Sequence, residues 1–410
     1  MKERCSESNL INGLGKQRRV SSGAKAGISW LYMSEPKAPT PEPAFVRWLF
    51  VELFRLAIGR KELIDCEPMA VHIGLIGGGN ISETHARAAR EIPGVSIAAV
   101  YGTNQDKVAR LSGEYGATPY ANFPKFLEHR PMDLVAIGSP SGLHAQQGIA
   151  AAEKGLHILT EKPLDISTAH ADELIDASQK AGVKLGVFFQ DRFKTDLIRL
   201  KQWADAGVLG RLILVDARVK WFRPPSYYGD SRWRGTLRWD GGGALINQGI
   251  HTVDLLLWVC GDVSAVQAVR KTALHRMEVE DTLVALLEFK NGAIGSLQAA
   301  TSAFPGYPRR MELTGSEGTA IIEHDRLVAA DLRVVPNDFQ STGDDRNASA
   351  SSATVSDVRG HQAALTDFIH AIETNGTPRC SGGEGRKSLA LVEAIYKACA
   401  SGERVELNAN

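Results

Sequence analysis

The sequence predicts an α/β protein in which a doubly wound, parallel Rossmann sheet precedes a second α/β domain with an open, mostly antiparallel sheet. Short apolar runs alternate with helical stretches of about ten residues between positions 70 and 190, as in parallel sheets covered on both faces. A glycine-rich turn, Gly77-Gly78-Gly79, follows the first apolar run. After residue 190 the pattern changes to strands joined by tight turns such as Asn291-Gly292, which is a strong hairpin signal.

The first domain is predicted over residues 69–190, and right-handed crossovers between its strands give the doubly wound sheet. Its predicted strands are Val71–Ile76, Ile97–Tyr101, Leu134–Ile137, His157–Thr160 and Lys184–Phe188. Its predicted helices are Ile81–Glu91, Gln105–Tyr115, Pro124–Glu128, His144–Lys154 and Ala169–Ala181.

The second domain is predicted over residues 191–408 and ends in an amphipathic helix over Ser388–Ser401. Residues 333–358 are rich in Ser, Asp and Asn, so we expect a mobile loop there. The predicted strands of this domain are Leu212–Trp221, Val263–Thr272, Thr282–Phe289, Ala293–Ala300 and Met311–Thr314.

The first 68 residues lack the strand–helix rhythm, and we interpret them as a disordered extension or a mis-assigned start, with folding beginning at Met69. The first thirty residues contain no apolar signal segment. Phe45–Ile58 is at most a short amphipathic helix, since it carries charges and is shorter than the ~20 residues that a membrane span needs.

The composition argues against several classes of partner. Acidic and basic residues balance at 47 each, so neither a nucleic acid nor a membrane surface is expected to bind. The five cysteines are scattered without a CxxC pair, which argues against a disulfide framework and a metal site. A reducing cytoplasm is the expected location.

The glycine turn has the context of a dinucleotide-binding fingerprint, because it follows a strand and opens a helix. Gly77 permits the tight turn, and Gly79 lets the backbone approach a pyrophosphate at the helix N-terminus, where Asn80 and Ile81 begin the helix. Ser82 stands in place of the third glycine, where it either widens the helix packing or contacts phosphate.

The second strand ends in Gly102, Thr103 and Asn104, without the acid that binds the ribose hydroxyls of NAD. Gly102 leaves room for a 2′-phosphate, and Lys107 or Arg110 could pair with it. NADP is therefore favoured slightly over NAD, although both cations could equally lie on a solvated helix face.

Two later strand ends are expected to border the nicotinamide. Ser139 and Pro140 follow the Leu134–Ile137 strand, and His144 opens the next helix, either as a cofactor contact or as a capping residue. Glu161 and Lys162 follow the next strand. The Lys162–Pro163 bond is a candidate for a cis peptide that aims the lysine inward.

A second polar cluster follows Gly241-Gly242-Gly243. Asn247 and His251 are four residues apart, on one face of a predicted helix. A histidine ordinarily titrates near neutral pH and can accept a hydroxyl proton. The preceding segment, residues 227–239, includes Trp233 and Arg234, whose aromatic face and planar donors suit a carbohydrate ring, although such a segment could also form an interface.

These motifs occur in order at a spacing that resembles the glucose–fructose oxidoreductase / inositol dehydrogenase family (Gfo/Idh/MocA) over residues 70–408. The resemblance implies Lys162 and His251 as the catalytic pair, Arg192 as a further cofactor residue, and a homo-oligomer formed through the C-terminal sheet. Many members carry aspartate where this chain has Asn247, which favours an orienting role for that residue.

The resemblance is greatest to members that oxidise C3 of pyranosides or nucleotide sugars. It predicts an NAD(P)-dependent dehydrogenase that moves hydride between nicotinamide and a secondary sugar hydroxyl. Alternatives are an inositol 2-dehydrogenase, a redox-assisted glycosidase and a non-catalytic regulator that senses the cofactor.

Overall fold

The computed structural model describes residues 70–334 and 357–407. The extension predicted over residues 1–68, with Phe45–Ile58, and most of the loop expected at 333–358 lie outside the described residues. Within the described part of the chain, no helix is long and apolar enough to cross a bilayer.

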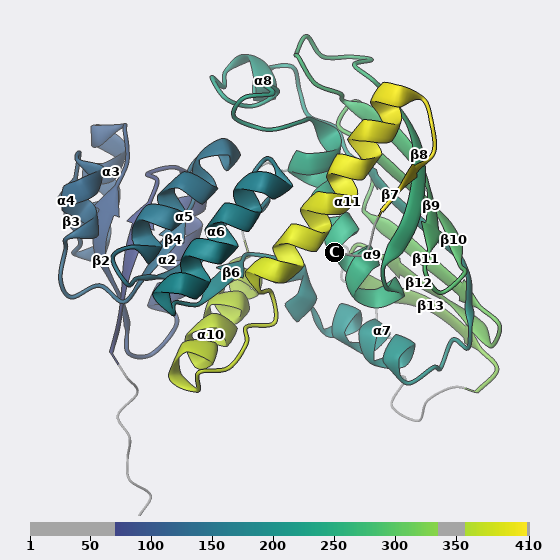
Figure 1. Ribbon diagram of the computed structural model, residues 1–410, viewed down its shortest axis with the longest axis horizontal. Helices are drawn as coiled ribbons and strands as arrows, with labels where there is room; N and C mark the ends of the chain where they lie inside the picture. Colours follow the sequence, from purple (N-terminus) through teal and green to yellow (C-terminus); the bar gives the residue numbers. More distant parts are fainter. Residues whose placement is uncertain (1–69, 335–356, 408–410) are drawn as a thin grey trace, which may run out of the picture. The chain divides into compact units, whose positions relative to one another are not determined.

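A six-stranded parallel sheet of order β3-β2-β1-β4-β5-β6 forms the first half of the described structure (Figure 1). The predicted parallel, doubly wound sheet is therefore confirmed. Its strands are β1 (Val71–Ile76), β2 (Val95–Tyr101), β3 (Thr118–Tyr120), β4 (Leu134–Ile137), β5 (His157–Thr160) and β6 (Leu185–Val187).

Three helices of this half, α3, α4 and α6, begin at side-chain caps that the sequence supplies. The Asn104 side chain accepts a hydrogen bond from the N–H of Lys107, and Gly116 ends the same helix at φ 68°, which explains the agreement of α3 with its predicted bounds. The helices are α2 (Asn80–Arg90), α3 (Gln105–Tyr115), α4 (Phe123–Leu127), α5 (His144–Ala152) and α6 (Thr168–Ala181), with 3₁₀ turns η1 (Ser141–Leu143) and η2 (Gln190–Phe193).

A helix from near the end of the chain completes this half. Helix α10 (Arg359–Glu373) packs against α2, and its buried Leu365 and Phe368 join one core cluster with Ile73 of β1. The side chain of Phe368 approaches so closely that a Cβ on Gly186 would lie 2.8 Å from it. The Rossmann half therefore uses residues far outside the 69–190 range.

The second half contains an eight-stranded sheet of order β13-β12-β11-β7-β10-β9-β8-β14, in which the β7–β10 pair is parallel and the other pairs are antiparallel. The predicted mostly antiparallel second sheet is confirmed. Its strands are β7 (Leu212–Lys220), β8 (Val263–Lys271), β9 (Thr282–Phe289), β10 (Ile294–Ala300), β11 (Arg310–Gly315), β12 (Gly318–Glu323), β13 (Arg326–Leu332) and β14 (Val405–Glu406).

One face of this sheet is covered and the other carries exposed apolar side chains. In Figure 1, helices α7, α9 and α11 lie on the side of the sheet that faces the first half. Burial in β9 alternates from residue to residue, as expected for a sheet with one covered face. The remaining helices are α7 (Thr195–Asp205), α8 (Ser226–Gly229), the π-helical η3 (Ala244–Gly249), α9 (Ile250–Cys260) and α11 (Gly382–Ser401).

A buried ion pair links the point where the chain leaves the first sheet to the helices of the second half. Arg192, in η2, donates from Nε and Nη2 to the two carboxylate oxygens of Asp254 in α9, at 2.8 and 2.7 Å. Its Nη2 also lies 3.0 Å from Glu384 of α11. Arg192 is thus enclosed by protein, and it holds η2, α9 and α11 together.

Replacing Arg192 with Met should lower the free energy of unfolding by about 3–5 kcal/mol, because it leaves the Asp254 carboxylate buried without its cation. Denaturant unfolding of the variant measures this loss. The double variant Arg192→Met/Asp254→Leu should recover most of it, since both charges are then removed. A double variant no more stable than Arg192→Met would contradict the pairing.

Candidate functional site

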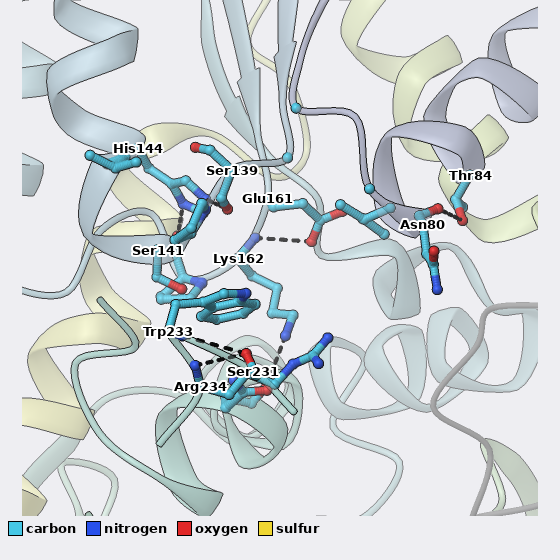
Figure 2. A pocket seen from close by; sticks show the side chains of 18 of the residues that line it. Asn80, Thr84, Ser139, Ser141, His144, Glu161, Lys162, Ser231, Trp233 and Arg234 are labelled. Atoms are coloured by element: carbon cyan, nitrogen blue, oxygen red, sulfur yellow. Dashed lines mark hydrogen bonds between the residues drawn. The ribbon is translucent and has the colours of Figure 1, made fainter. Parts of the chain in front are cut away.

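A cavity of about 1250 Å³ lies at the carboxyl ends of the parallel strands and extends to the η2, η3 and β7–α8 segments of the second half. The carboxyl edge of a doubly wound sheet is the usual place for a ligand crevice. Figure 2 shows Asn80 on one side of Glu161 and Lys162, Ser139 and His144 on another, and Lys162 reaching toward the segment that holds Trp233 and Arg234.

Nearly all of the predicted site residues line this cavity, which brings together segments from residue 77 to residue 251. Arg192 and Ser82 do not: Arg192 is enclosed in its ion pair, and Ser82 is buried beneath the glycine turn. The predicted residues that line it are Gly77, Gly79, Asn80, Ile81, Gly102, Thr103, Asn104, Lys107, Ser139, Pro140, His144, Glu161, Lys162, Trp233, Arg234, Asn247 and His251.

The glycine turn fits a dinucleotide. Gly77 has φ +125°, and a Cβ there would lie 2.9 Å from the Gly138 oxygen, so no other residue suits the position. A Cβ on Gly79 would meet nothing within 4 Å, because this residue faces the open cavity. Gly79 also leaves the N-terminus of α2 without a side-chain cap, so its N–H groups are available to a pyrophosphate.

The end of β2 is crowded around Gly102. A Cβ there would lie 3.0 Å from Val108 Cγ2 and 3.3 Å from the Gly78 nitrogen, which accounts for the glycine. Lys107 lines the cavity, whereas Arg110 pairs with Glu83 at 2.7 Å and does not line it. Of the two side chains that the sequence suggested as partners of a 2′-phosphate, only Lys107 therefore lines the cavity.

His144 holds two turns of the cavity wall together. Its Nδ1 lies 2.8 Å from the Pro163 oxygen and its Nε2 lies 3.0 Å from the Ser139 oxygen. A neutral imidazole has one N–H, so it can donate to one of these carbonyls at a time. The ring therefore positions the Ser139 and Pro163 turns around the cofactor space.

Lys162 is the cation at the centre of the cavity. The Lys162–Pro163 bond is cis, as the sequence indicated, and Nζ donates to the backbone oxygen of Asn247 at 2.7 Å. Burial lowers the pKa of Lys162, while the nearby carboxylates of Glu161 and Asp240 oppose that shift. The ammonium is therefore held where it can hydrogen-bond a substrate oxygen.

His251 is a neutral base. Burial lowers its pKa to about 3, because the opposing attraction of Asp191 does not compensate for lost hydration and the charge of Lys162 lowers the pKa further. The sequence suggested that His251 has the ordinary histidine pKa, near neutral pH. That expectation is therefore wrong for this residue. Its Nδ1 lies 3.8 Å from Asp191 and bonds no described group, which leaves Nε2 for the cavity.

Asn247 belongs to a hydrogen-bond chain. Its Nδ2 donates to Asp240 at 2.6 Å, and its Oδ1 accepts from Gln248 at 2.7 Å. Gln248 in turn bonds Tyr227 and Arg223. The side chain of Asn247 is thus fixed by protein partners, which favours the orienting role expected for it.

Glu161 forms the centre of a buried group behind Lys162. His85 of α2 places Nε2 2.9 Å from Glu161 Oε1, and His361 of α10 places Nε2 3.6 Å from the same oxygen. Burial alone would raise the pKa of Glu161, but its hydrogen bonds with His361 and His85 hold the pKa well below the usual value. An ionised carboxylate therefore remains beside Lys162.

The same three side chains could be considered as metal ligands, since their ligating atoms lie within 4.8 Å of one another. However, Nδ1 of both histidines is buried without a described hydrogen-bond partner. Metal-binding histidines usually donate this second N–H to a carboxylate or carbonyl. The hydrogen bond to Glu161 accounts for the arrangement without a metal.

Comparison with known proteins identifies the family. The model for an oxidoreductase family with an NAD-binding Rossmann fold, GFO/IDH/MocA, matches residues 71–189, and the model for a GFO/IDH/MocA C-terminal domain matches residues 197–321. The chain belongs to the GFO/IDH/MocA family. It is an NAD-binding oxidoreductase of the sugar and polyol dehydrogenase type, which supports the enzyme over the regulator.

The chain is similar to GFO/IDH/MocA relatives over most of its length. The crystal structure of the WlbA dehydrogenase from Bordetella pertussis, in complex with NADH and UDP-GlcNAcA, is 30% identical, with a TM-score of 0.76, covering 84% of this chain and 99% of that one. Myo-inositol 2-dehydrogenase of Thermotoga maritima is 26% identical (82% and 98% covered), and D-glucoside 3-dehydrogenase of Escherichia coli is 24% identical (85% and 100% covered).

Several residues of this GFO/IDH/MocA site were missed by the sequence reasoning. Most of them lie in segments that only the tertiary structure brings together, so no local pattern marks them. Asp191, Asp240 and Gln248 directly adjoin Arg192, the Gly241-Gly242-Gly243 run and Asn247, so their places beside predicted motifs could have been noticed. The missed residues are His85, Asp191, Lys194, Arg223, Asp240, Gln248, Arg309, Asp325 and His361.

Replacing Glu161 with Gln should move the alkaline limb of the kcat profile to lower pH by about one to three units. The reason is that the Glu161 carboxylate raises the pKa of Lys162, so its removal lets the ammonium deprotonate earlier. Steady-state turnover of methyl β-D-glucoside provides the measurement. It should be recorded from about pH 6 to about pH 11, a range that includes the ordinary pKa of a lysine side chain. The exposed Glu153→Gln is the matched control, and an unmoved limb in Glu161→Gln would remove this electrostatic role.

Proposed function

We propose that this protein oxidises the C3 hydroxyl of a pyranoside or nucleotide sugar. The observation that carries the proposal is that a charged donor, Lys162, and a neutral base, His251, face one cavity that begins at the glycine turn. The D-glucoside 3-dehydrogenase and WlbA relatives, the latter bound to UDP-GlcNAcA, support this substrate class.

His251 and Lys162 have different roles at the substrate hydroxyl. His251 accepts the hydroxyl proton at Nε2, and the Asp191 carboxylate beside Nδ1 favours the tautomer in which Nε2 is free. Lys162 donates a hydrogen bond to the same oxygen and stabilises the negative charge that develops on it. A nicotinamide cofactor held at the glycine turn would supply the hydride acceptor.

The proposed C3 regiochemistry is based on the hydroxyl arrangement of the substrate and on the side chains at the cavity. A glucopyranoside has three adjacent equatorial hydroxyls with C3 in the middle, and Lys162, His251 and Asn247 all line the cavity. Holding the flanking hydroxyls directs C3–H toward the nicotinamide. Oxidation at C1 would require the anomeric end to turn inward.

Methyl β-D-glucoside deuterated at C3 should transfer its deuterium to the cofactor and leave a 3-keto product. NMR of the sugar product and of the reduced cofactor gives the answer. Deuterium retained in the sugar after cofactor reduction would exclude C3, and turnover of myo-inositol alone would favour the inositol dehydrogenase alternative, which the Thermotoga relative represents.

The cofactor preference is proposed to be NADP, because the end of β2 lacks an acid and Lys107 faces the cavity. Lys107→Gln should then weaken NADP binding about tenfold or more while changing NAD binding little, since a phosphate loses a charged partner. Calorimetric titration of both cofactors measures the two constants. Arg110→Gln, whose cation pairs with Glu83, is the control, and equal losses for NAD and NADP would oppose the assignment. The relatives crystallised with NADH make NAD the alternative outcome.

We also propose that a second copy of the chain covers the exposed face of the eight-stranded sheet. Leu214, Leu286 and Ile294 are 49%, 56% and 59% exposed, and register places them side by side around a hollow of about 310 Å³. Contiguous apolar surface of this kind marks protein interfaces. A symmetric dimer would bury it.

Leu286→Glu should convert the dimer into a monomer, because it places a carboxylate in an apolar contact. Light scattering after size-exclusion chromatography measures the mass. Leu274→Glu, equally exposed but in a loop, should leave the mass unchanged. A wild-type protein that is monomeric at micromolar concentration would contradict the proposal.

A further inference from the structure

The lining of the cavity carries an excess of positively charged side chains. Seven lysines and arginines line the cavity, against four aspartates and glutamates. Three of the four acids already have partners within the protein: Glu161 bonds His85, and Asp191 and Asp325 pair with Lys194 and Arg309.

Two of the arginines converge on one aromatic ring. The guanidinium of Arg234 lies 4.4 Å from the centroid of Tyr227, and that of Arg223 lies 5.5 Å from the same centroid. Arg234 also lies 5.1 Å from the ring of Trp233. Stacking on two rings fixes the plane of the guanidinium and leaves its edge for a ligand.

Arg234 forms no ion pair with any carboxylate of the described residues, and its Nε is enclosed without a hydrogen-bond partner among them. The acid whose charge it influences is Asp240. Both oxygens of Asp240 are engaged, one with the Gly235 N–H at 2.9 Å and the other with Asn247. Arg234 is therefore a cation, held by two aromatic rings, whose guanidinium has no hydrogen-bond partner among residues 70–334 and 357–407.

We infer that Arg234 binds an anionic group of the substrate, a carboxylate or a phosphate, through the edge of its guanidinium. Both groups present paired oxygens that match the guanidinium fork. A neutral sugar hydroxyl could accept one hydrogen bond but would leave the half-buried charge of Arg234 without an anionic partner. The substrate class is thus narrowed from sugars in general to acidic sugars or sugar phosphates, including nucleotide sugars.

This inference rests on the proposed function for the reacting hydroxyl of the substrate, whereas it concerns an anionic group of the same substrate. Arg234 should therefore affect the binding of the substrate and leave the chemical step unchanged. A residue that only supports the fold would change the KM of neutral and anionic substrates alike. An anion-binding residue would change only the KM of the anionic substrates.

The test uses the NAD(P)-loaded protein and three probes that share the same ring hydroxyls. They are methyl β-D-glucoside, which is neutral, methyl β-D-glucuronide, which carries a carboxylate, and UDP-glucose, which carries a diphosphate. We expect at least one anionic probe to have a KM about 10- to 100-fold below that of the neutral glucoside, as a charged hydrogen bond allows. The probe that shows this preference identifies the anion.

Arg234→Gln should raise the KM of the preferred anionic probe by about 10- to 100-fold, with kcat and the neutral KM nearly unchanged, and Arg234→Lys should recover part of the loss. Arg238→Gln is the matched control, because Arg238 also stacks on a tryptophan, 4.6 Å from the Trp239 centroid, but does not line the cavity. Equal losses for neutral and anionic probes, or a wild-type protein without an anion preference, would overturn the inference.

The outcome also separates this inference from the proposed function. If the neutral glucoside is oxidised but no anionic probe is preferred, the proposed function stands and the anion site is refuted. If none of the probes reduces the cofactor, calorimetric binding of the same three probes still decides the question. Tighter binding of an anionic probe that Arg234→Gln abolishes would support the site, and equal binding of all three would refute it.

Discussion

The site depends on keeping a lysine charged in a place where water is largely excluded. An ammonium moved out of water loses hydration that only nearby negative charge and hydrogen bonds can replace. Lys162 has both, because Nζ bonds the Asn247 oxygen and the carboxylates of Glu161, Asp240 and Asp191 act on it. Each of these three carboxylates also interacts with other side chains. The interactions that affect Lys162 therefore extend to distant residues of the structure.

Those partners join distant parts of the chain. Glu161 is bonded to His85 from the first helix of the Rossmann half and approached by His361 from α10. Asp191 is paired with Lys194 and Arg309. One residue after Asp191, Arg192 fixes the same turn to α9 and α11 through Asp254. The geometry around Lys162 is therefore a property of the packed halves together, and α10 and α11, at the end of the chain, are required for it.

The sequence predicted residues that line the cavity near the glycine turn because local signals mark them. A glycine turn after a buried strand, a helix cap at Asn104 and a lysine at a strand end are each marked by neighbours in sequence. The strands that were predicted agree with the structure to within one or two residues at each end, but β12 and β13 were not predicted. Short β3 was missed because three residues with a central Pro119 carry too little pattern, and such edge strands tolerate proline.

The substrate wall was predicted less completely because its contacts are made between segments far apart in sequence. Arg192 resembled a cofactor residue by its position, but burial against Asp254 decides its role, and no local pattern reports that partner. Glu161 likewise meets His85 and His361, which lie in helices distant from it in sequence. Tertiary packing thus fixes the roles that spacing alone left open.

The two members of the proposed catalytic pair have opposite electrostatic requirements. In the proposed mechanism Lys162 must be a cation, whereas His251 must be a neutral acceptor although it lies near Asp191. The Asp191 carboxylate raises the pKa of His251, but burial of the ring lowers that pKa by more, and Asp191 is itself paired with Arg309 and Lys194. Because Asp191 lies 3.8 Å from Nδ1, its negative charge favours the tautomer with the proton on Nδ1, which is the tautomer that the proposed base requires.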